Sequence, residues 1–190
     1  MCFYIHRDRK MALETERLIL RPREDSDVED LYKYAKDPEV WPVAWWMPHK
    51  SIEESREVLA KILKAPETYA IVHKQDKSTI GSISLMQGKS SRLNKSWKDA
   101  EIGFWLWVPY WWQGLAPEAA KELIRHGFED LKVDKIRSAY YKGNDKSKRV
   151  QEKCWFKYIE TQDNIYCPLV DETRTRIVQC LTKEEREKNK

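Results

Sequence analysis

Residues 102–119 read IGFWLWVPYWWQGLAPEA and contain a strand, a glycine turn and the start of a helix. The apolar run predicts a strand over 100–108, and the periodicity that follows predicts a helix over 117–131 with Pro117 in its favoured first position. Gly114 lies in the turn between them. Such a turn directs free backbone N–H groups and the positive end of a helix dipole toward one point, which suits a phosphate. A plain structural turn is the alternative, since neither a Walker loop nor a G-x-G-x-x-G motif is present.

Outward from this turn, hydrophobic spacing and breaker residues predict an α/β domain. The expected sheet is mixed and mostly antiparallel, flanked by helices, with a parallel crossover around the 117–131 helix. Ser51 and Glu54 form a capping box for a helix that ends at Leu63, and 87–98 is expected to be a surface loop. The other expected strands are 14–21, 69–73, 79–86, 135–141, 155–161 and 173–181. The other expected helices are one that starts after the capping residues 25–27 and stops at 37–38, and one over 145–154.

The length of 190 residues fits one domain, expected over 11–182, with an N-terminal extension at 1–10 and a frayed charged tail at 183–190. No apolar stretch approaches the roughly 20 residues of a membrane helix, and the first ten residues do not form a signal peptide, so a cytoplasmic protein is expected. The formal charge of +4 comes from interspersed residues, which argues against a nucleic-acid partner. Four scattered cysteines and four scattered histidines show no metal-binding spacing, so no metal is expected.

The segment Trp111-x-x-Gly114-x-Ala116-Pro117-Glu118-Ala119 resembles the acetyl-CoA pyrophosphate loop of the GNAT N-acetyltransferases. It is most similar to the ribosomal-protein (RimJ/RimL-type) branch, in which Trp112 would be a glycine. A second block with the family pattern contains Asn144 and Ser147, then 152–156, where Trp155 replaces a glycine. The opening block 15–21 is also typical of this branch. The resemblance therefore covers roughly 12–181, nearly the whole chain.

The resemblance implies acetyl-CoA as cosubstrate. Phe104 and Leu106 would offer strand backbone to the pantetheine arm, and backbone N–H groups from Trp112 to Ala116 would bind the pyrophosphate. Asn144 would bind the cofactor near its thioester, and Ser147 would protonate the leaving thiolate; alternatively, Ser147 supports the start of a helix. The implied cofactor-binding residues are Phe104, Leu106, Trp111, Trp112, Gln113, Gly114, Leu115, Ala116, Pro117, Asn144 and Ser147.

Acetyl transfer requires a deprotonated amine, and a lysine needs a base more than an α-amine does, given pKa values of about 10.4 and 7.7–8.0. Glu101 is the candidate general base; the alternative is a solvated charge at a strand edge. Tyr140 and Tyr141 are alternatives to Ser147 as the proton donor; the other interpretation is that they are packing residues.

Trp45, Trp46 and His49 are the candidate residues for binding the amine acceptor, because aromatic rings attract cationic amines. Core packing or a homodimer surface is the other interpretation of these rings. The sequence thus predicts an N-acetyltransferase that acts on a protein N-terminal α-amine or a small-molecule amine. The alternatives are a polyamine or antibiotic-amine acetyltransferase and a catalytically silent acyl-CoA sensor.

Overall fold

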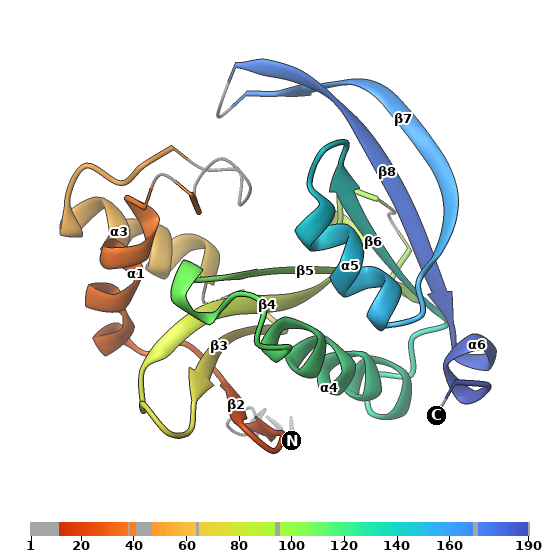
Figure 1. The fold of residues 1–190 in the computed structure, drawn as a ribbon, viewed down its shortest axis with the longest axis horizontal. Coiled ribbons are helices and arrows are strands. Elements are labelled where there is room, and N and C mark those ends of the chain that lie inside the picture. The colour runs from red at the N-terminus through yellow and green to blue at the C-terminus, as the bar shows by residue number, and fades with distance from the viewer. Residues whose placement is uncertain are drawn as a thin grey trace, which may run out of the picture.

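One twisted sheet organises the computed structural model, which describes residues 12–37, 39–40, 47–63, 65–93, 96–168 and 171–189 (Figure 1). Within these residues the sheet has eight strands in the order β1-β2-β3-β4-β5-β6-β8-β7. The strands are β1 (Leu13–Glu14), β2 (Leu18–Arg21), β3 (Thr68–His73), β4 (Thr79–Gln87), β5 (Asp99–Leu106), β6 (Lys135–Tyr141), β7 (Lys157–Cys167) and β8 (Glu172–Thr182). The expected extension at 1–10 and the candidates Trp45 and Trp46 lie outside the described residues.

Every neighbouring pair of strands is antiparallel except β5 and β6, which are parallel. A parallel pair needs a crossover connection, and the long helix between these two strands supplies it. The predicted mixed, mostly antiparallel sheet is therefore confirmed. The helices are α1 (Val28–Ala35), α3 (Ile52–Val58), α4 (Leu115–Glu129), α5 (Asp145–Lys153) and α6 (Lys183–Glu187), with a π-helical turn over Leu59–Leu63 and short 3-10 turns at Asp25–Asp27, Gly88–Ser90 and Val108–Tyr110.

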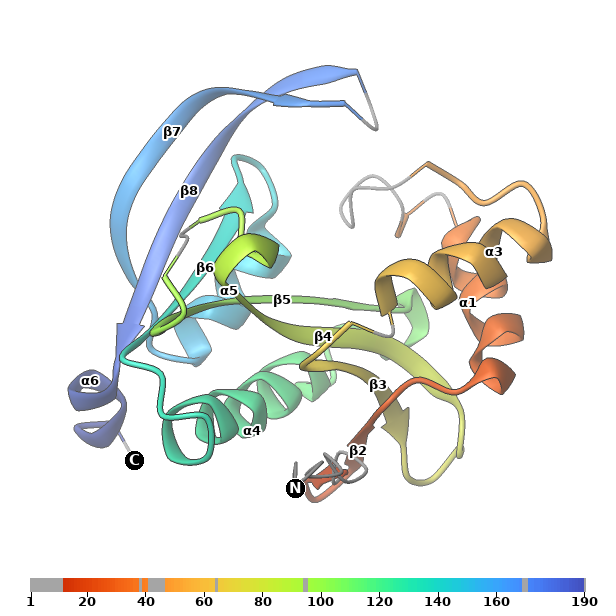
Figure 2. The same cartoon turned by 180° about the vertical axis from the view of Figure 1, so that it is seen from behind.

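The helices cover both faces of β5, as alternating side chains on that strand show. Ile102 and Leu106 belong to the main hydrophobic core, which also holds Leu123 and Phe128 of α4. Trp105 instead packs against the smaller core that α1 and α3 help to form (Figures 1 and 2). Since neighbouring residues of a strand point to opposite faces, α4 lies on one face of β5 and α1 and α3 lie on the other.

Strand β5 separates from β6 after only three paired residues. The parallel ladder joins Asp99, Ala100 and Glu101 to β6, whereas β5 remains paired with β4 from Ala100 to Leu106. The second half of β5 therefore has a β-partner on one edge and a gap on the other. This gap determines where the site forms.

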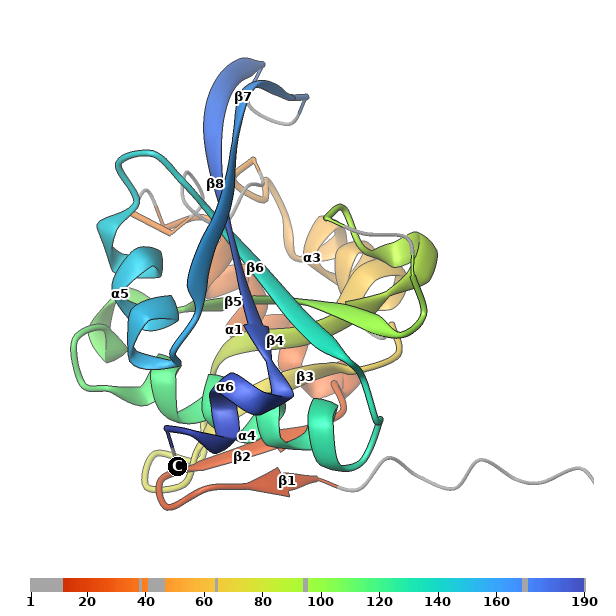
Figure 3. The same ribbon diagram turned by 90° about the vertical axis from the view of Figure 1, so that its right-hand side faces the viewer.

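Strands β7 and β8 extend beyond the rest of the sheet as a long, arched hairpin (Figures 1 and 3). Each has 11 residues, and β7 is exposed along most of its length. The base of the hairpin packs on β6, while its upper part projects past α5 (Figure 3). We call this projecting part, residues 160–168 and 171–176, the arm.

Three expectations about local structure were wrong. The segment 14–21 is not one strand but a tight hairpin of β1 and β2, closed where Thr15 N donates to Leu18 O at 3.0 Å. Helix α4 begins at Leu115, two residues before Pro117. The tail is not frayed over 183–187, because Thr182 and Glu185 form a capping box for α6 and Arg186 pairs with Glu129 at 2.8 Å.

Asp27 anchors the start of α1 to β2, and it is 2% exposed. Its two carboxylate oxygens accept from Arg21 Nη1 and Nη2 at 2.9 and 2.8 Å, and Thr79 Oγ1 donates to it at 2.7 Å. Burial acts to raise the pKa of Asp27, but these hydrogen bonds outweigh it and hold the pKa below its usual value. The carboxylate therefore stabilises the fold above the unfolded-state pKa of about 3.9, and this contribution is lost as the pH falls through the lower folded-state value.

We predict that Asp27→Asn lowers the free energy of unfolding at pH 7 by about 3 kcal/mol, because Arg21 loses its ionic partner in a largely buried site. The variant should also lose less stability than the wild type when the pH is lowered from 5 to 3. Urea unfolding at both pH values measures this. Equal acid sensitivity of the two proteins would mean that other carboxylates carry the effect.

Candidate active site

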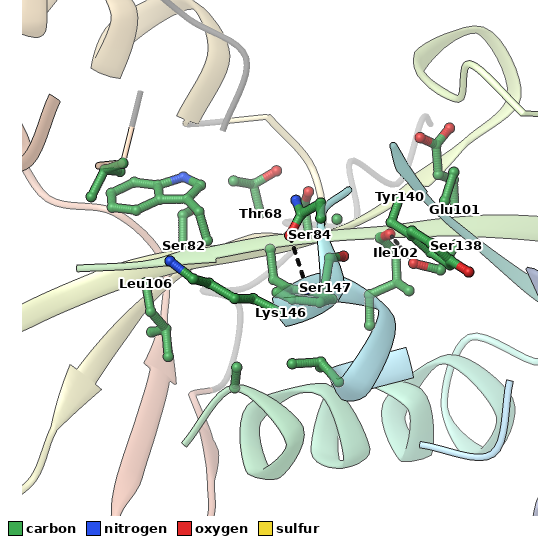
Figure 4. Close-up of a pocket in the computed structure, with 18 of the residues that line it drawn as sticks. Thr68, Ser82, Ser84, Glu101, Ile102, Leu106, Ser138, Tyr140, Lys146 and Ser147 are labelled. Atoms are coloured by element: carbon green, nitrogen blue, oxygen red, sulfur yellow. Dashed lines mark hydrogen bonds between the residues drawn. The ribbon is translucent and has the colours of Figure 1, made fainter. Parts of the chain in front are cut away.

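A cavity of about 910 Å³ lies along the gap between β5 and β6. It is bounded by β4, β5 and β6, by the turn before α4, by the start of α5, and by the segment around His49. Figure 4 shows Lys146 and Leu106 toward one end of this cavity, and Glu101, Ser138 and Tyr140 toward the other. Its size suits a cofactor together with a small substrate.

The backbone of β5 faces the gap at alternate residues. Ile102 O accepts from Ser138 Oγ at 3.3 Å, and Leu106 O accepts from Trp111 Nε1 at 2.7 Å, so both carbonyls point away from β4. Because strand amide groups alternate in direction, the N–H and C=O of Phe104 also face the gap. Phe104 is thus placed as the resemblance implies, whereas Leu106 retains only its N–H for a ligand.

The turn before α4 holds two residues in the left-handed region, Trp112 at φ 65° and Gly114 at φ 78°. Gly114 is the N-cap of α4, so the helix begins with Leu115 and Ala116, whose N–H groups have no partner within the helix. Pro117 lies one position after them and lacks an N–H, at a point in the first turn where that group is not needed. We call residues 111–117 the phosphate loop.

All the residues implied for cofactor binding line the cavity except Gln113. The Gln113 side chain donates to Pro109 O at 2.8 Å, and the Gln113 backbone carbonyl accepts from Arg17 Nη1 at 3.0 Å. Gln113 therefore supports the phosphate loop through contacts made outside the cavity.

Glu118 fixes the phosphate loop to the β1–β2 hairpin, which sequence reasoning did not anticipate. Its carboxylate accepts from Thr15 Oγ1 at 2.5 Å, from Arg17 N at 2.9 Å and from Arg17 Nε at 2.7 Å. Burial acts to raise the pKa of Glu118, but these donors lower it overall, so the group is a carboxylate at neutral pH. Thr15, Arg17 and Glu118 were each quoted in the blocks of the resemblance, but more than 100 residues separate Thr15 from Glu118 and nothing in the sequence pairs them.

Both tryptophans that replace family glycines adopt the glycine-like backbone conformation. Trp112 and Trp155 each have φ 65°. Trp155 follows the end of α5, where a left-handed residue commonly terminates a helix. Trp112 is 70% exposed, so its ring projects outward and does not force the backbone of the turn out of its glycine-like conformation. The substitutions are therefore accommodated at a cost in backbone strain.

Cationic side chains lie over the indole rings around the phosphate loop. Lys146 Nζ is 3.5 Å from the centre of the Trp111 ring, and Arg149 is 5.8 Å from that of Trp112. Lys121 and Lys153 border a second, smaller cavity beside Gly114 and Pro117. Cation–π contacts hold such charges in place, and together with the helix dipole they make this end of the cavity attractive to an anion.

The start of α5 presents a serine hydroxyl to the cavity. Asn144 Oδ1 caps the helix by accepting from Ser147 N at 3.1 Å, and the buried Gln151 donates from Nε2 to Ser147 Oγ at 3.1 Å. Because Gln151 uses an acceptor position on this oxygen, the Ser147 proton remains available for donation. The start of α5 is therefore supported by Asn144 and the backbone N–H of Ser147. The Ser147 hydroxyl is not needed for this support and faces the cavity.

Glu101 is buried, at 4% exposed, so the interpretation of a solvated edge charge was wrong. Its Oε2 accepts from Ser91 Oγ at 2.9 Å, Arg92 N at 2.6 Å and Leu93 N at 3.1 Å. Its Oε1 lies 3.6 Å from Arg92 Nη2 and is the less engaged oxygen. The expected surface loop at 87–98 therefore packs partly inward, with Ser91 buried against Glu101.

His49 is buried and its Nδ1 lies 2.7 Å from Ser55 Oγ. Burial lowers the pKa of His49, so the ring is neutral at pH 7. It lines the cavity, next to the segment that contains the Trp45 and Trp46 positions. In the part of the chain that the structure describes, no cluster of three or more His, Cys, Asp or Glu could hold a metal ion, and no helix is long and apolar enough to cross a membrane.

Comparison with known proteins matches residues 17–157 to the acetyltransferase (GNAT) domain family. The chain is 30% identical to the uncharacterized N-acetyltransferase p20 of Bacillus licheniformis over 66% of this chain and 70% of that protein. A solved ribosomal-protein-S5-alanine acetyltransferase from Vibrio fischeri has a TM-score of 0.72 at 19% identity, covering 92% of this chain and 98% of its own. The spermidine N-acetyltransferase of Vibrio cholerae, solved with CoA and spermine, has a TM-score of 0.74 at 16% identity, covering 91% and 99%. These structures share the fold.

We predict that Trp112→Gly raises the free energy of unfolding by about 1 kcal/mol, since glycine adopts a positive φ without strain and the exposed ring buries little surface. For a chain of this length the melting temperature should rise by about 2–4 °C. Thermal unfolding with and without the substitution measures this. A lower melting temperature would show that the Arg149–Trp112 contact outweighs the strain.

Proposed function

The chain belongs to the GNAT acetyltransferase family, and from this premise we propose that it transfers an acetyl group from acetyl-CoA to a primary amine. The observation that carries the proposal is the gap between β5 and β6, which leads directly to the phosphate loop. The cavity thus offers strand backbone, free helix N–H groups and cationic side chains in one continuous path.

The residues present fit acetyl-CoA. The N–H groups of Leu115 and Ala116 and the left-handed Gly114 would hold the pyrophosphate, as helix N-termini commonly do. Phe104 would pair its backbone with the pantetheine amides, in the manner of an added strand. Lys146 and Arg149 would supply positive charge beside the phosphates. When bound, acetyl-CoA supplies an activated thioester.

Ser147 and Glu101 are the proposed proton-transfer residues. The Ser147 hydroxyl would donate its proton to the departing thiolate, and Gln151 would orient it. Glu101 Oε1 would accept the amine proton, directly or through a water, while Oε2 remains bound to the 91–93 segment. An α-amine, with a pKa of about 7.7–8.0, needs little of this help near neutral pH.

The amine acceptor is the second partner in the reaction, and the sequence pattern narrows its class. The phosphate-loop pattern supports the ribosomal-protein branch, and hence a protein N-terminal α-amine or a small-molecule amine as the acceptor. Gly114, Asn144 and Ser147 are all in place around the cavity, which favours an active enzyme over an acyl-CoA sensor. A homodimer with Trp45 and Trp46 at its surface stays a prediction.

We predict that acetyl-CoA binds the wild type at one site with micromolar affinity and that Gly114→Glu abolishes this binding, because a carboxylate would face the pyrophosphate. Gly114→Ala is the matched control. It imposes the same strain at φ 78° without adding charge, and the space is open, since the nearest atom to a new Cβ is Arg17 Nη2 at 3.6 Å. Calorimetric titration distinguishes the three proteins. Normal binding by Gly114→Glu would show that the phosphate loop has been misassigned.

We predict that Ser147→Ala lowers kcat about 10²-fold, in line with loss of a general acid, with little change in affinity for acetyl-CoA. Thiol release with an accepted amine gives the rate, and calorimetry gives the affinity. Ser138→Ala, on β6 and outside the proposed proton path, is the control for a lost cavity hydroxyl. A Ser147→Ala enzyme with an unchanged kcat would remove Ser147 from the acid role.

A further inference from the structure

We propose that the amine acceptor of this enzyme is a small molecule that also carries an anionic group, bound by Arg92 and Arg176 beside Tyr141. The inference rests on the proposed function and extends it by naming the chemical class of the acceptor. It concerns the end of the cavity beneath the arm, away from the phosphate loop.

The described residues that line the cavity carry more positive than negative charge, and Arg92 and Arg176 are the arginines among them that lie outside the phosphate-loop end. Among the described residues that line the cavity, the two carboxylates are Glu54 and Glu101, both outside the phosphate-loop end. Three donors bind Glu101 Oε2, which leaves Oε1 for the proposed base role, and Glu54 Oε2 accepts from Lys50 N at 2.7 Å at the start of α3. Two carboxylates among the described lining residues do not form the acidic wall that would attract a polyamine.

Arg176 is held in place by a neutral side chain, and among the described residues no carboxylate forms an ion pair with it. It lies on β8 directly opposite Tyr141 of β6, so the two side chains project from the same face. Its Nε and Nη2 donate to Gln162 Oε1 at 2.9 and 2.5 Å. Gln162 in turn donates from Nε2 to Glu160 at 2.6 Å, which fixes the amide with its oxygen toward Arg176. The guanidinium is thus oriented by a neutral group.

Arg92 brings a second guanidinium to the same place. Its nearest carboxylate oxygen, Glu101 Oε1, is 3.6 Å away, beyond hydrogen-bond distance, and its side chain is 63% exposed. Burial raises the pKa of Tyr141, and the positive charges of Arg176 and Arg92 both act against this rise. Both charges act on one phenol, and all three side chains line the same cavity.

Two guanidinium groups and a phenol form a suitable site for a carboxylate or a phosphate. Arg92 lies next to Glu101, at the point where β5 and β6 separate and where the amine would react, and Tyr141 and Arg176 line the same cavity farther along β6 and β8. A molecule that carries both groups would place its amine by Glu101 and its anion toward these guanidinium groups. The arrangement therefore fits an amino acid or an amino phosphate, and it disfavours a polycation such as spermidine.

The experiment measures thiol release from acetyl-CoA with matched pairs of amines. Each amino acid is compared with its decarboxylated amine, and phosphoethanolamine is compared with ethanolamine, with spermidine included. The acid-bearing member of at least one pair should have a kcat/KM about tenfold higher or more. Whether the carboxylate or the phosphate pairs show the effect identifies the anion.

Arg176→Gln should lower kcat/KM for the preferred acceptor by about tenfold, mainly through KM, and Arg176→Lys should lose less. Arg174→Gln is the control, since Arg174 is on the same strand but outside the cavity. Arg92→Gln is a second variant at an exposed position, where folding is not at risk. Acetyl-CoA affinity should remain unchanged in all four proteins.

Three results would overturn the inference: preference for spermidine, equal rates within every matched pair, or unchanged KM in both Arg176→Gln and Arg92→Gln. An enzyme that binds acetyl-CoA but acetylates no acid-bearing amine would also overturn it. Failure to bind acetyl-CoA at all would instead refute the proposed function, so the two failures are distinguishable.

Discussion

The carboxylate of Glu118 is the contact on which the geometry of the site depends. It joins the β1–β2 hairpin to the first turn of α4 through Thr15 and Arg17, while Arg17 also holds the carbonyl of Gln113. The phosphate loop needs this support, because two left-handed residues make it costly to fold. With its outer side anchored to the sheet, the loop can present the N–H groups of Leu115 and Ala116 to the cavity without reorganising.

The separation of β5 from β6 supplies the second half of the site. Strand β5 is paired with β4 as far as Leu106, so its backbone is held from one side while its other edge is left for a ligand. Trp111 and Ser138 occupy the carbonyls at Leu106 and Ile102, which leaves Phe104 as the exposed backbone unit between them. The cavity follows this strand, with Leu106 and Lys146 toward one end and Glu101 toward the other (Figure 4).

The sequence predicted the sheet, the long crossover helix and the glycine turn before that helix because each depends on local signals: apolar periodicity, glycine and capping residues. It failed where a residue's role depends on a distant partner. The alternative interpretation of Glu101, a solvated charge, was wrong, because the 91–93 segment that satisfies the carboxylate has no periodic pattern. The α6 tail looked frayed because the burial of Arg186 against Glu129 joins residues 57 positions apart. Arg176 and Gln162 were missed for the same reason.

The central claim is that one path, from Phe104 to the first turn of α4, binds acetyl-CoA. Residue-resolved amide hydrogen exchange, with and without acetyl-CoA, tests it most directly. The account predicts slower exchange at Phe104, Gly114, Leu115 and Ala116, and no change along the outer strand β7. Saturating acetyl-CoA that left these four amides unprotected, or protected a different surface, would contradict it.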